Sequence, residues 1–536
     1  MLACATAQAE KPMNFVVIIA DDMPPEYIGA YGVGKYPTPN IDKLARDGER
    51  FTTSFSISPM CTPARFAIMT GRYPCRCTAP LFKKDAGTDP SQPAMIAWNT
   101  PIDSQELTLA KQLTAQGYNT GIAGKWHLAT HADEAPLPDL KDGSLECPDT
   151  LKQMELRQQM IQKFICESGG FTCARSLFIE NCDEEPLVAN HNIPYITRGA
   201  IEILHTFAKE EKPFLLITTP TGIHGPWLAD VLDKDLHYTP GGYIEDIYDY
   251  APNYAALRKT IETFSSGEKH KHVGMVEIDY QLGRIRAELE KLGLADNTAV
   301  IFTSDHGVEP GKCSVYDRGM RVPFIVYWPR LTAPGTVTDS MVQHVDLTAS
   351  IAATAGVPDI GKTMDGVDLR PVLTDPSATV RKFAYFECGY SRGITDGRYK
   401  LISTRLPDSI ITKALNGEYK WMTVGMGPGS GAHAAFSQLA YPDYYAPDQF
   451  YDFKRDPYEQ DSVFANPEYA SAQAKLRTAL TQITDSMPYA FPEEVQPFFA
   501  TTTYKKLSER TRRENDPTTK DWVKRDHDQI IWPPNN

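Results

Sequence analysis

Acidic, histidine and lysine side chains follow apolar runs of this 536-residue sequence, at the point where each run ends. These residues are Asp21, Asp22, Lys125, His127, His224, Asp305 and His306. Continuous apolar runs are typical of buried parallel strands, and open α/β sheets bind ligands beyond the carboxyl ends of their strands. The sequence therefore predicts that these side chains gather at one edge of a sheet and form a site there.

Three of these side chains are the carboxylates Asp21, Asp22 and Asp305. Carboxylates that share one site repel one another unless a cation lies between them, and oxygen ligands favour Ca²⁺ or Mg²⁺ over Zn²⁺. Lysine and histidine beside such a metal suit a tetrahedral oxyanion such as sulfate or phosphate. The residue types thus indicate metal-assisted hydrolysis of an anionic ester.

A cysteine motif narrows this prediction. The segment from Cys61 to Arg72 reads CTPARFAIMTGR. Pro63 can open a helix, which places the Cys61 sulfur near the positive end of that helix, and Arg65 lies one turn further on. From local chemistry alone, the same residues also fit a buried or disulfide-bonded cysteine beside a turn.

The segment resembles the C-x-P-x-R…T-G signature of the formylglycine-dependent sulfatases, in the alkaline phosphatase superfamily. The resemblance runs in order from Asn14 to about Asp461 and includes TPNIDKLARDG, GKWH, SDHG, KCSVYDRGMRVP and FYDFKRDPYEQDS. It implies that a maturation enzyme converts Cys61 to formylglycine. One hydroxyl of the hydrated formylglycine would attack sulfur, and the second would then expel sulfate.

The resemblance also implies a set of metal ligands for one Ca²⁺. They are Asp21, Asp22, Asp305, His306 and the modified Cys61. At position 306 the family often has asparagine, so His306 departs from the more common pattern.

Five further residues match family positions that act on the substrate. Arg65 would orient the formylglycine, and Lys125 and Lys312 would bind sulfate oxygens. His127 would assist deprotonation of the formylglycine hydroxyl in the release step. His224 would donate a proton to the leaving alcohol, a role suited to a group that titrates near neutrality.

The substrate class follows less directly. Trp227, close after His224, is a candidate for binding sugar rings, whereas Trp98 is expected to pack in the core. A sulfated polysaccharide or oligosaccharide is the predicted substrate. The alternatives are a small aryl or choline sulfate, a phosphodiester or phosphonate substrate, and a non-catalytic glycan-binding protein.

Strand and helix patterns alternate along most of the chain, which predicts an α/β fold with a large, mostly parallel sheet between helices, as in the sulfatases. The catalytic domain is expected over residues 13–382, with a surface insertion at about 130–190. A smaller α+β domain with a short antiparallel sheet is expected over 383–490, and a tail wrapping the surface over 491–536. The predicted strands are Asn14–Ala20, Asn119–Ala123, Phe214–Thr219, Thr298–Thr303 and Phe324–Trp328, and the principal predicted helices are Thr38–Gly48, Ser104–Gly117, Thr197–Lys209 and Val273–Leu292.

Composition excludes some classes of protein. The formal net charge of -14 argues against a general nucleic-acid binder, and no apolar run reaches the roughly 18 residues of a membrane span. Residues 1–12 are expected to be a signal-peptide remnant or a disordered terminus, because Ala7–Ala9 resembles a signal-peptidase site. Four cysteines crowd residues 147–182 and are expected to form disulfides. Periplasmic or secreted localisation is therefore predicted; the oligomeric state is not.

Overall fold

The computed structural model describes residues 11–32, 34, 36–87, 89–134, 136–140, 143–418, 430 and 433–514. The predicted signal-peptide remnant up to residue 10 and the end of the predicted tail, from 515 onward, lie outside these residues. No helix in the described ranges is both long and apolar enough to cross a membrane.

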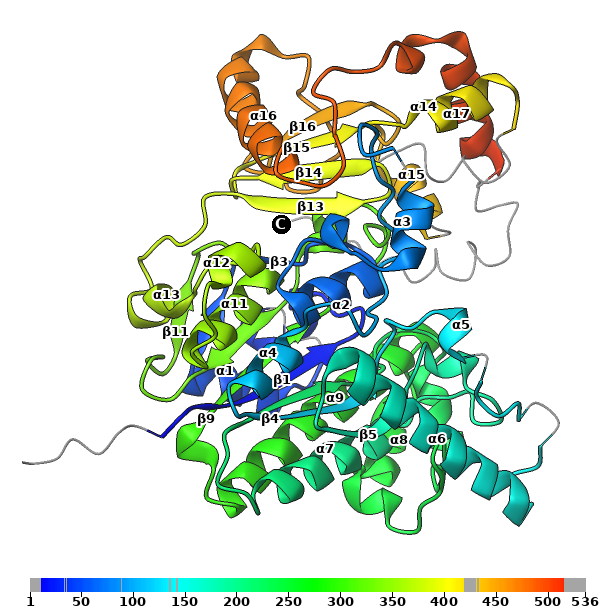
Figure 1. The fold of residues 1–536 in the computed structure, drawn as a ribbon, viewed down its shortest axis with the longest axis vertical. Coiled ribbons are helices and arrows are strands. Elements are labelled where there is room, and N and C mark those ends of the chain that lie inside the picture. The colour runs from blue at the N-terminus through cyan, green and yellow to red at the C-terminus, as the bar shows by residue number, and fades with distance from the viewer. Residues whose placement is uncertain are drawn as a thin grey trace, which may run out of the picture.

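The helices and strands alternate as the sequence pattern predicts (Figure 1). The strands are β1 Asn14–Ala20, β2 Glu49–Phe51, β3 Ser54–Phe55, β4 Asn119–Lys125, β5 Cys173–Phe178, β6 Phe214–Thr219, β7 Tyr238–Thr239, β8 Gly242–Tyr243, β9 Thr298–Ser304, β10 Phe324–Tyr327, β11 Thr336–Thr338, β12 Val342–Gln343, β13 Ala384–Cys388, β14 Ser391–Thr395, β15 Tyr399–Thr404 and β16 Asp448–Asp452. The helices are α1 Pro39–Asp47, α2 Cys61–Thr70, α3 Pro80–Ala86, α4 Leu109–Ala115, α5 His131–Glu134, α6 Pro148–Gly169, α7 Ile193–Phe207, α8 Tyr254–Ile261, α9 Ser266–Lys291, α10 Asp317–Met320, α11 His344–Thr354, α12 Ile360–Thr363, α13 Arg370–Thr374, α14 Asp408–Leu415, α15 Ala434–Ala440, α16 Ala470–Thr484 and α17 Thr502–Glu514.

The central sheet has eight strands in the order β11-β2-β10-β9-β1-β6-β4-β5. Strand β1 lies between β9 and β6 and is parallel to both, and β6, β4 and β5 continue the parallel arrangement. Strand β10 runs antiparallel to its neighbours β9 and β2, so the sheet is mixed but mostly parallel. The predicted α/β class is confirmed.

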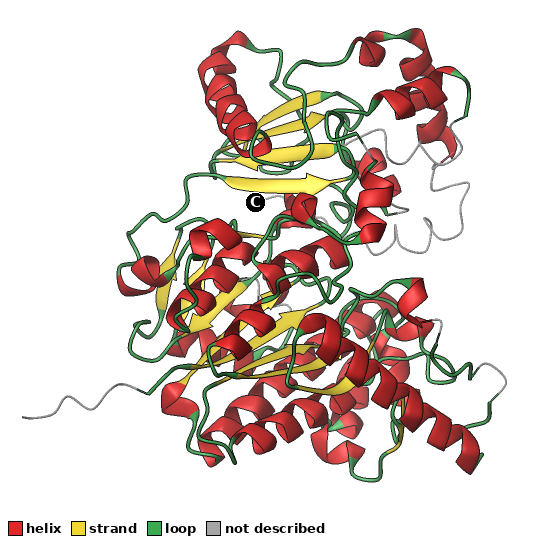
Figure 2. Ribbon diagram, viewed as in Figure 1, coloured by secondary structure: helices red, strands yellow, loops and turns green. Residues whose placement is uncertain are grey.

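Helices cover both faces of this sheet because successive side chains of β1 point to opposite sides (Figure 2). Phe15, Val17 and Ile19 join a core cluster with residues of α2, α4, α6 and α11. Val16 and Ile18 join a second cluster with residues of α1, α7 and α9. A strand buried on both faces reads as a continuous apolar run, which explains why β1 was recognisable in the sequence.

A smaller antiparallel sheet of β13, β14, β15 and β16 follows, as predicted, and α16 packs on β14 and β15 (Figure 1). It joins the larger part through two apolar clusters. In one, Phe55 and Met60 pack with Phe386. In the other, Ile57 packs with Tyr385. The small sheet therefore supports the segment that leads into α2.

Three helices begin at residues other than those predicted, because side-chain caps select their first turns. Helix α4 starts at Leu109 rather than Ser104, since the Thr108 hydroxyl accepts a hydrogen bond from Lys111 N–H. Asn192 caps α7, and Ser265 caps α9 with a capping box. Capping groups of this kind satisfy N–H groups that have no partner in the helix.

The prediction of a surface insertion at about 130–190 is wrong in part. Residues of β5 form the edge strand of the central sheet and pair in parallel with β4. The sequence CARSLF hid this strand because Arg175 and Ser176 interrupt its apolar pattern. An edge strand has one neighbour only and tolerates such polar residues better than a central strand does.

The predicted disulfides are also not found, because all nine cysteines of the described ranges are free. The four crowded cysteines belong to different elements. Cys147 is exposed before α6, Cys166 lies in α6, Cys173 begins β5 and Cys182 begins a short 3-10 helix. Closeness in sequence therefore does not bring their sulfur atoms together in bonded pairs.

Candidate active site

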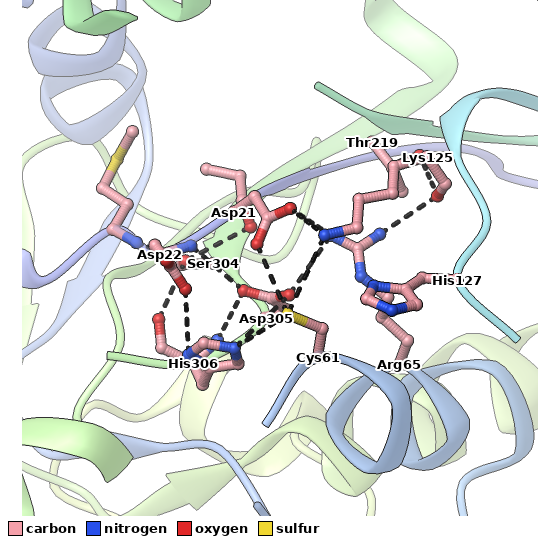
Figure 3. Close-up of polar contacts among 12 residues, drawn as sticks. Asp21, Asp22, Cys61, Arg65, Lys125, His127, Thr219, Ser304, Asp305 and His306 are labelled. Carbon is pink, nitrogen blue, oxygen red and sulfur yellow. Dashed lines mark hydrogen bonds and ion pairs between the residues drawn. The ribbon is translucent and has the colours of Figure 1, made fainter. Parts of the chain in front are cut away.

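Most of the predicted side chains meet beyond the carboxyl ends of the central strands, and Figure 3 shows those of β1, α2, β4 and β9. Asp21 and Asp22 follow β1, and Asp305 and His306 follow β9. The Asp305 N–H donates to the Ala20 carbonyl, 2.9 Å away, which keeps the two strand ends side by side. Parallel pairing of β1 and β9 thus brings together residues almost three hundred positions apart in sequence.

Cys61 is the first residue of α2 and is buried. Its Sγ lies 3.3 Å from His306 Nε2, and 3.8 Å from both Asp21 Oδ1 and Lys125 Nζ. A side chain at a helix N-terminus lies near the positive end of the helix dipole. The thiol therefore points into the group of charged residues that follows the strands.

Arg65, one turn further along α2, is fully buried. Its Nη2 lies 3.2 Å from Asp305 Oδ2 and 3.5 Å from Asp21 Oδ2, and its Nη1 donates to the Lys125 carbonyl at 3.1 Å. One guanidinium therefore bridges the ends of β1, β4 and β9. This arrangement orients the carboxylates around Cys61.

A metal ion fits the donors at this position. Ligand atoms of Asp21, Asp22, Cys61 and His306 all lie within 4.8 Å of one another. Buried Asp22 Oδ1 and Asp305 Oδ2 accept no hydrogen bond; their nearest cationic neighbours are His306 Nδ1 at 3.4 Å and Arg65 Nη2 at 3.2 Å, so both oxygens can still bind a cation. Oxygen-rich sets of this kind suit Ca²⁺, and oxidation of Cys61 to an oxygen-bearing group would make the set harder still.

Two lysines hold the aspartates of β1 in the ionised form. Lys125 Nζ lies 2.6 Å from Asp21 Oδ2, and Lys312 Nζ lies 2.6 Å from Asp22 Oδ2. Burial opposes ionisation of Asp21, but the neighbouring cations, led by Lys125 and Arg65, together outweigh it and hold the pKa of this carboxyl well below its usual range. Burial also opposes ionisation of Asp22, yet Lys312 lowers its pKa to about 2. Both carboxylates are therefore charged at neutral pH.

The three carboxylates of this cluster also favour a further positive charge among them, either a proton on His306 or a bound cation. Burial disfavours a charged imidazole, but Asp305 and Cys61 raise the pKa of His306 to about 10. Burial, followed by the neighbouring Asp21, raises the pKa of Asp305. The three carboxylates are balanced by three permanent cations, Arg65, Lys125 and Lys312. A divalent cation would leave the cluster net positive, which suits an anionic sulfate group.

His127 lies next to a carboxyl group that the sequence reasoning missed. His127 Nε2 is 3.1 Å from Glu180 Oε2, and its Nδ1 is buried without a hydrogen-bond partner. Burial and then Lys125 lower the pKa of His127 well below its usual range. Burial, Glu134 and Glu184 raise the pKa of Glu180 to about 8. At neutral pH, the proton of this pair therefore resides on Glu180.

Glu180 could have been found by the criterion that located the other residues. It follows Ile179 directly beyond β5, so it too stands at the carboxyl end of a parallel strand. The criterion failed because β5 itself was not recognised.

His224 lies in the loop after β6, and its Nδ1 is 2.7 Å from the Gly225 carbonyl. Burial, reinforced by the positive charge of Lys312, lowers the pKa of His224 to about 3. It is thus neutral at pH 7 in the free protein. An anionic group bound beside Lys312 would offset that charge and raise the pKa, as a proton donor requires.

A cavity of about 500 Å³ opens onto Cys61, and His127, Glu180, His224 and Lys312 line it. Trp98 also lines this cavity and is 41% exposed, so the prediction that Trp98 packs in the core is wrong. Trp227, the predicted sugar-binding residue, lies instead in an adjoining cavity of about 440 Å³. The loop position of Trp98 could not be read from periodicity.

A mostly parallel sheet with a buried thiol, carboxylates and cations beyond its strand ends is suited to the hydrolysis of an oxyanion ester. Residues 13–357 match the sulfatase family, and the chain belongs to that family. It is a sulfatase that hydrolyses sulfate esters, and Cys61 lies in its candidate metal site.

Individual relatives extend this likeness over most of the chain. Human arylsulfatase A is 27% identical over 545 residues, which cover 92% of this chain and 93% of the human protein. The ulvan-active sulfatase of Formosa agariphila is 26% identical, with 89% of this chain and 80% of that protein covered. A structure solved in complex with its substrate D-glucosamine-2-N,6-O-disulfate matches with a TM-score of 0.58 at 19% identity. The match covers 91% of this chain and 100% of that chain. This last likeness supports the fold.

Proposed function

We propose that this sulfatase removes sulfate from a polysaccharide or oligosaccharide. The reacting group would be a formylglycine made from Cys61 by a maturation enzyme. One Ca²⁺ would be held by Asp21, Asp22, Asp305 and His306 together with residue 61. The observation that carries the proposal is the position of the Cys61 thiol, 3.3 Å from His306 Nε2 and within the carboxylate cluster.

Each group has a defined contribution in this proposal. Formylglycine supplies a hydrated aldehyde, whose two hydroxyl groups serve attack on sulfur and release of sulfate. Bound Ca²⁺ supplies positive charge that stabilises negative oxygens. Arg65 holds the surrounding carboxylates in place through its contacts with Asp21 and Asp305. Lys125 and Lys312 would bind sulfate oxygens; both contact the carboxylate cluster, and Lys312 also lines the cavity.

Proton transfer falls to the two histidines that line the cavity. His224 would donate a proton to the leaving alcohol as an imidazolium, which forms once the bound sulfate has raised its pKa, because a poor leaving group must be protonated as it departs. His127 would take a proton from the hydroxyl of residue 61 at its Nδ1, which is free to do so when the ionised Glu180 carboxylate accepts a hydrogen bond from Nε2–H.

Two features favour a glycan over a small aryl sulfate. The cavity at Cys61 is roomy and has a half-exposed indole, Trp98, on its wall. A flat aromatic face can pack against the apolar face of a sugar ring while the polar wall binds its hydroxyls. The ulvan-active relative acts on a glycan by its name, although arylsulfatase A is equally similar.

Release of free sulfate from a panel of sulfated oligosaccharides tests the proposal. The protein should be co-produced with a formylglycine-generating enzyme, and the peptide containing residue 61 should show the aldehyde by mass spectrometry. Cys61→Ala should reduce release to background, whereas Cys147→Ala, at an exposed cysteine outside the site, should leave it unchanged.

Two results would contradict the proposal. Turnover of aryl sulfates without turnover of any sulfated glycan would reject the substrate class. A preference of about a hundredfold for matched phosphate esters would be too large for a sulfatase site and would reject sulfate as the substrate group.

The predicted export also remains part of this proposal. A glycan of polymeric size meets the enzyme most directly in the periplasm or outside the cell. Fractionation of cells that produce the natural protein tests this: recovery in the cytoplasmic fraction alone would contradict it.

A further inference from the structure

Two cavities adjoin at the candidate active site. The first, of about 500 Å³, includes Cys61 and Trp98, and we call it the Trp98 arm. The second, of about 440 Å³, includes Asp22 and Trp227, and we call it the Trp227 arm. The two cavities share four lining residues, which are Asp183, His224, Lys312 and His433.

The shared residues place the reacting centre between the arms. Cys61 faces one arm and Asp22 the other, while Lys312 borders both and contacts Asp22 at 2.6 Å. A sulfate held by Lys312 therefore lies at the junction. The remainder of the substrate can leave this junction in two directions, each with space of the size that binds a small organic ligand.

Each arm presents one large, partly exposed indole. Trp98 is 41% exposed and Trp227 is 37% exposed. The two are the only tryptophans among the exposed large hydrophobic residues of the described chain. Exposed indoles on cavity walls are typical of binding surfaces that meet an amphipathic ligand, because one face is apolar and the N–H edge is polar.

The loop that carries Trp98 is fixed before any ligand binds. Ile96 and Gly389 exchange backbone hydrogen bonds of 3.0 and 2.7 Å, which attach the loop to the turn between β13 and β14. The Asn99 side chain accepts from the Ala97 N–H and donates to the Met95 carbonyl. A preorganised wall loses little conformational freedom on binding, which favours affinity.

The loop that carries Trp227 is held from two sides by buried histidines. His191 contacts Thr221 Oγ1 and the Pro226 carbonyl, each at 2.8 Å. His270 accepts from the Leu228 N–H at 2.6 Å and packs edge-to-face on Trp227. The same loop holds His224, so one rigid segment joins the junction to the second indole.

We propose that the substrate carries its sulfate on an internal residue of a glycan chain, with one neighbouring sugar in the Trp98 arm and another in the Trp227 arm. This inference rests on the proposed glycan sulfatase function and defines where along the chain that enzyme acts. A site specific for a chain end needs one blind cavity, whereas two adjoining arms accommodate a chain that continues on both sides of the sulfated residue.

Sulfated tetrasaccharides that carry one sulfate, either on an internal or on a terminal residue, test this inference. The wild-type enzyme should show a higher kcat/KM on the internally sulfated compound. Trp98→Ala and Trp227→Ala should each lower that kcat/KM by about tenfold, as expected for the loss of one stacking contact. On an aryl sulfate too small to fill both arms, each variant should lose less kcat/KM than on the internally sulfated tetrasaccharide.

Tyr243→Ala provides the matched control, because Tyr243 is 44% exposed and lines neither arm. A preference for the terminally sulfated compound, or wild-type kcat/KM in Trp227→Ala, would overturn the two-arm inference while leaving the glycan sulfatase assignment intact. Turnover of the aryl sulfate but of neither tetrasaccharide would instead reject the proposed glycan function, and the inference with it.

Discussion

At the scale of single residues, the site depends on how burial and neighbouring charge set protonation. Lys125 and Lys312 keep two aspartates ionised where burial alone would neutralise them. Glu180 shows the opposite outcome: burial, together with the neighbouring Glu134 and Glu184, raises its pKa, so it keeps its proton at neutral pH. The same residue type thus provides ionised carboxylates beside Cys61 and a neutral carboxyl group beside His127, because the nearest charges differ in sign.

Glu180 makes a specific pH dependence testable. The pKa of its carboxyl group is raised to about 8, so between about pH 7 and pH 9 it changes from a hydrogen-bond donor to an acceptor toward His127 Nε2. We expect the wild-type kcat to rise over this interval, because ionised Glu180 accepts from His127 Nε2–H and leaves Nδ1 free to take a proton. Glu180→Gln always offers a donor, so its pH profile should be flat there.

A second variant, Glu180→Ala, tests whether Glu180 positions the His127 imidazole. This variant removes the contact altogether and should lower kcat by about tenfold or more at neutral pH, as expected for the loss of an oriented catalytic hydrogen bond. If the change in kcat near pH 8 persists in Glu180→Gln, a group other than Glu180 is responsible for it.

At the scale of elements, the site is a junction of strand ends and one helix start. The donors come from β1, from α2 and from the segment after β9, and Arg65 links them. A cation bound there therefore stabilises contacts among elements distant in sequence. The loop after β6 depends instead on two neutral histidines, His191 and His270.

Metal removal should consequently affect both activity and stability. A ligand that binds only the folded state stabilises it by mass action, by about 2.7 kcal/mol at a hundred times its Kd. We expect a calcium chelator to abolish sulfate release and to lower the melting temperature, and Ca²⁺ to restore both better than Zn²⁺. In Asp22→Asn the calcium-dependent rise in melting temperature should shrink; an unchanged rise would place the ion elsewhere.

The histidine-held loop should make the fold sensitive to acid. Burial lowers the pKa of His191 to about 4 and that of His270 to about 3, against about 6.5 for an unfolded histidine. Below about pH 6.5 the unfolded state thus binds more protons than the folded state, so stability falls as the pH drops toward about 4. Between its folded and unfolded pKa values, each histidine should lower the free energy of unfolding by about 1.4 kcal/mol for every unit by which the pH falls.

Urea unfolding at neutral and mildly acidic pH measures this slope. His191→Gln keeps a donor and an acceptor but does not titrate, so the slope should decrease by the contribution of one proton. His131→Gln, at an exposed residue of α5, should leave the slope unchanged. An equal slope in wild type and His191→Gln would assign the acid sensitivity to other groups.

At the scale of the whole molecule, a net charge of -14 surrounds a locally cationic site for an anionic ester. The two act over different distances, because salt screens charges beyond about 8 Å at physiological ionic strength, whereas at about 0.01 M the distance is about 30 Å. The long-range field repels a sulfated chain, and the buried cations attract its sulfate only at contact.

Ionic strength should therefore change the rate at which enzyme and substrate meet more than the rate of the chemical step. We expect kcat/KM for a sulfated oligosaccharide to rise about twofold or more between about 0.01 and 0.15 M sodium chloride, while kcat stays constant. Initial rates at low substrate concentration measure the first quantity and saturating rates the second. A fall in kcat/KM would mean that the cations of the site dominate the field felt on approach.

The sequence by itself determined the parts that local pattern encodes. Apolar runs identified β1, β6 and β9, and the residues directly after the strands included Asp21 and Asp305. The motif around Cys61 specified the family, because its spacing and order are local properties of the chain. These elements are buried on both faces, so their composition is strongly constrained.

Only the tertiary structure decided what depends on distant neighbours. It placed Glu180 against His127, because the polar edge strand β5 leaves no clear pattern in the sequence. It turned Trp98 into a cavity wall through a contact with the turn after β13, and it kept the nine described cysteines unpaired. The physical reason is common to all three: burial and pairing are set by packing between segments far apart in the chain.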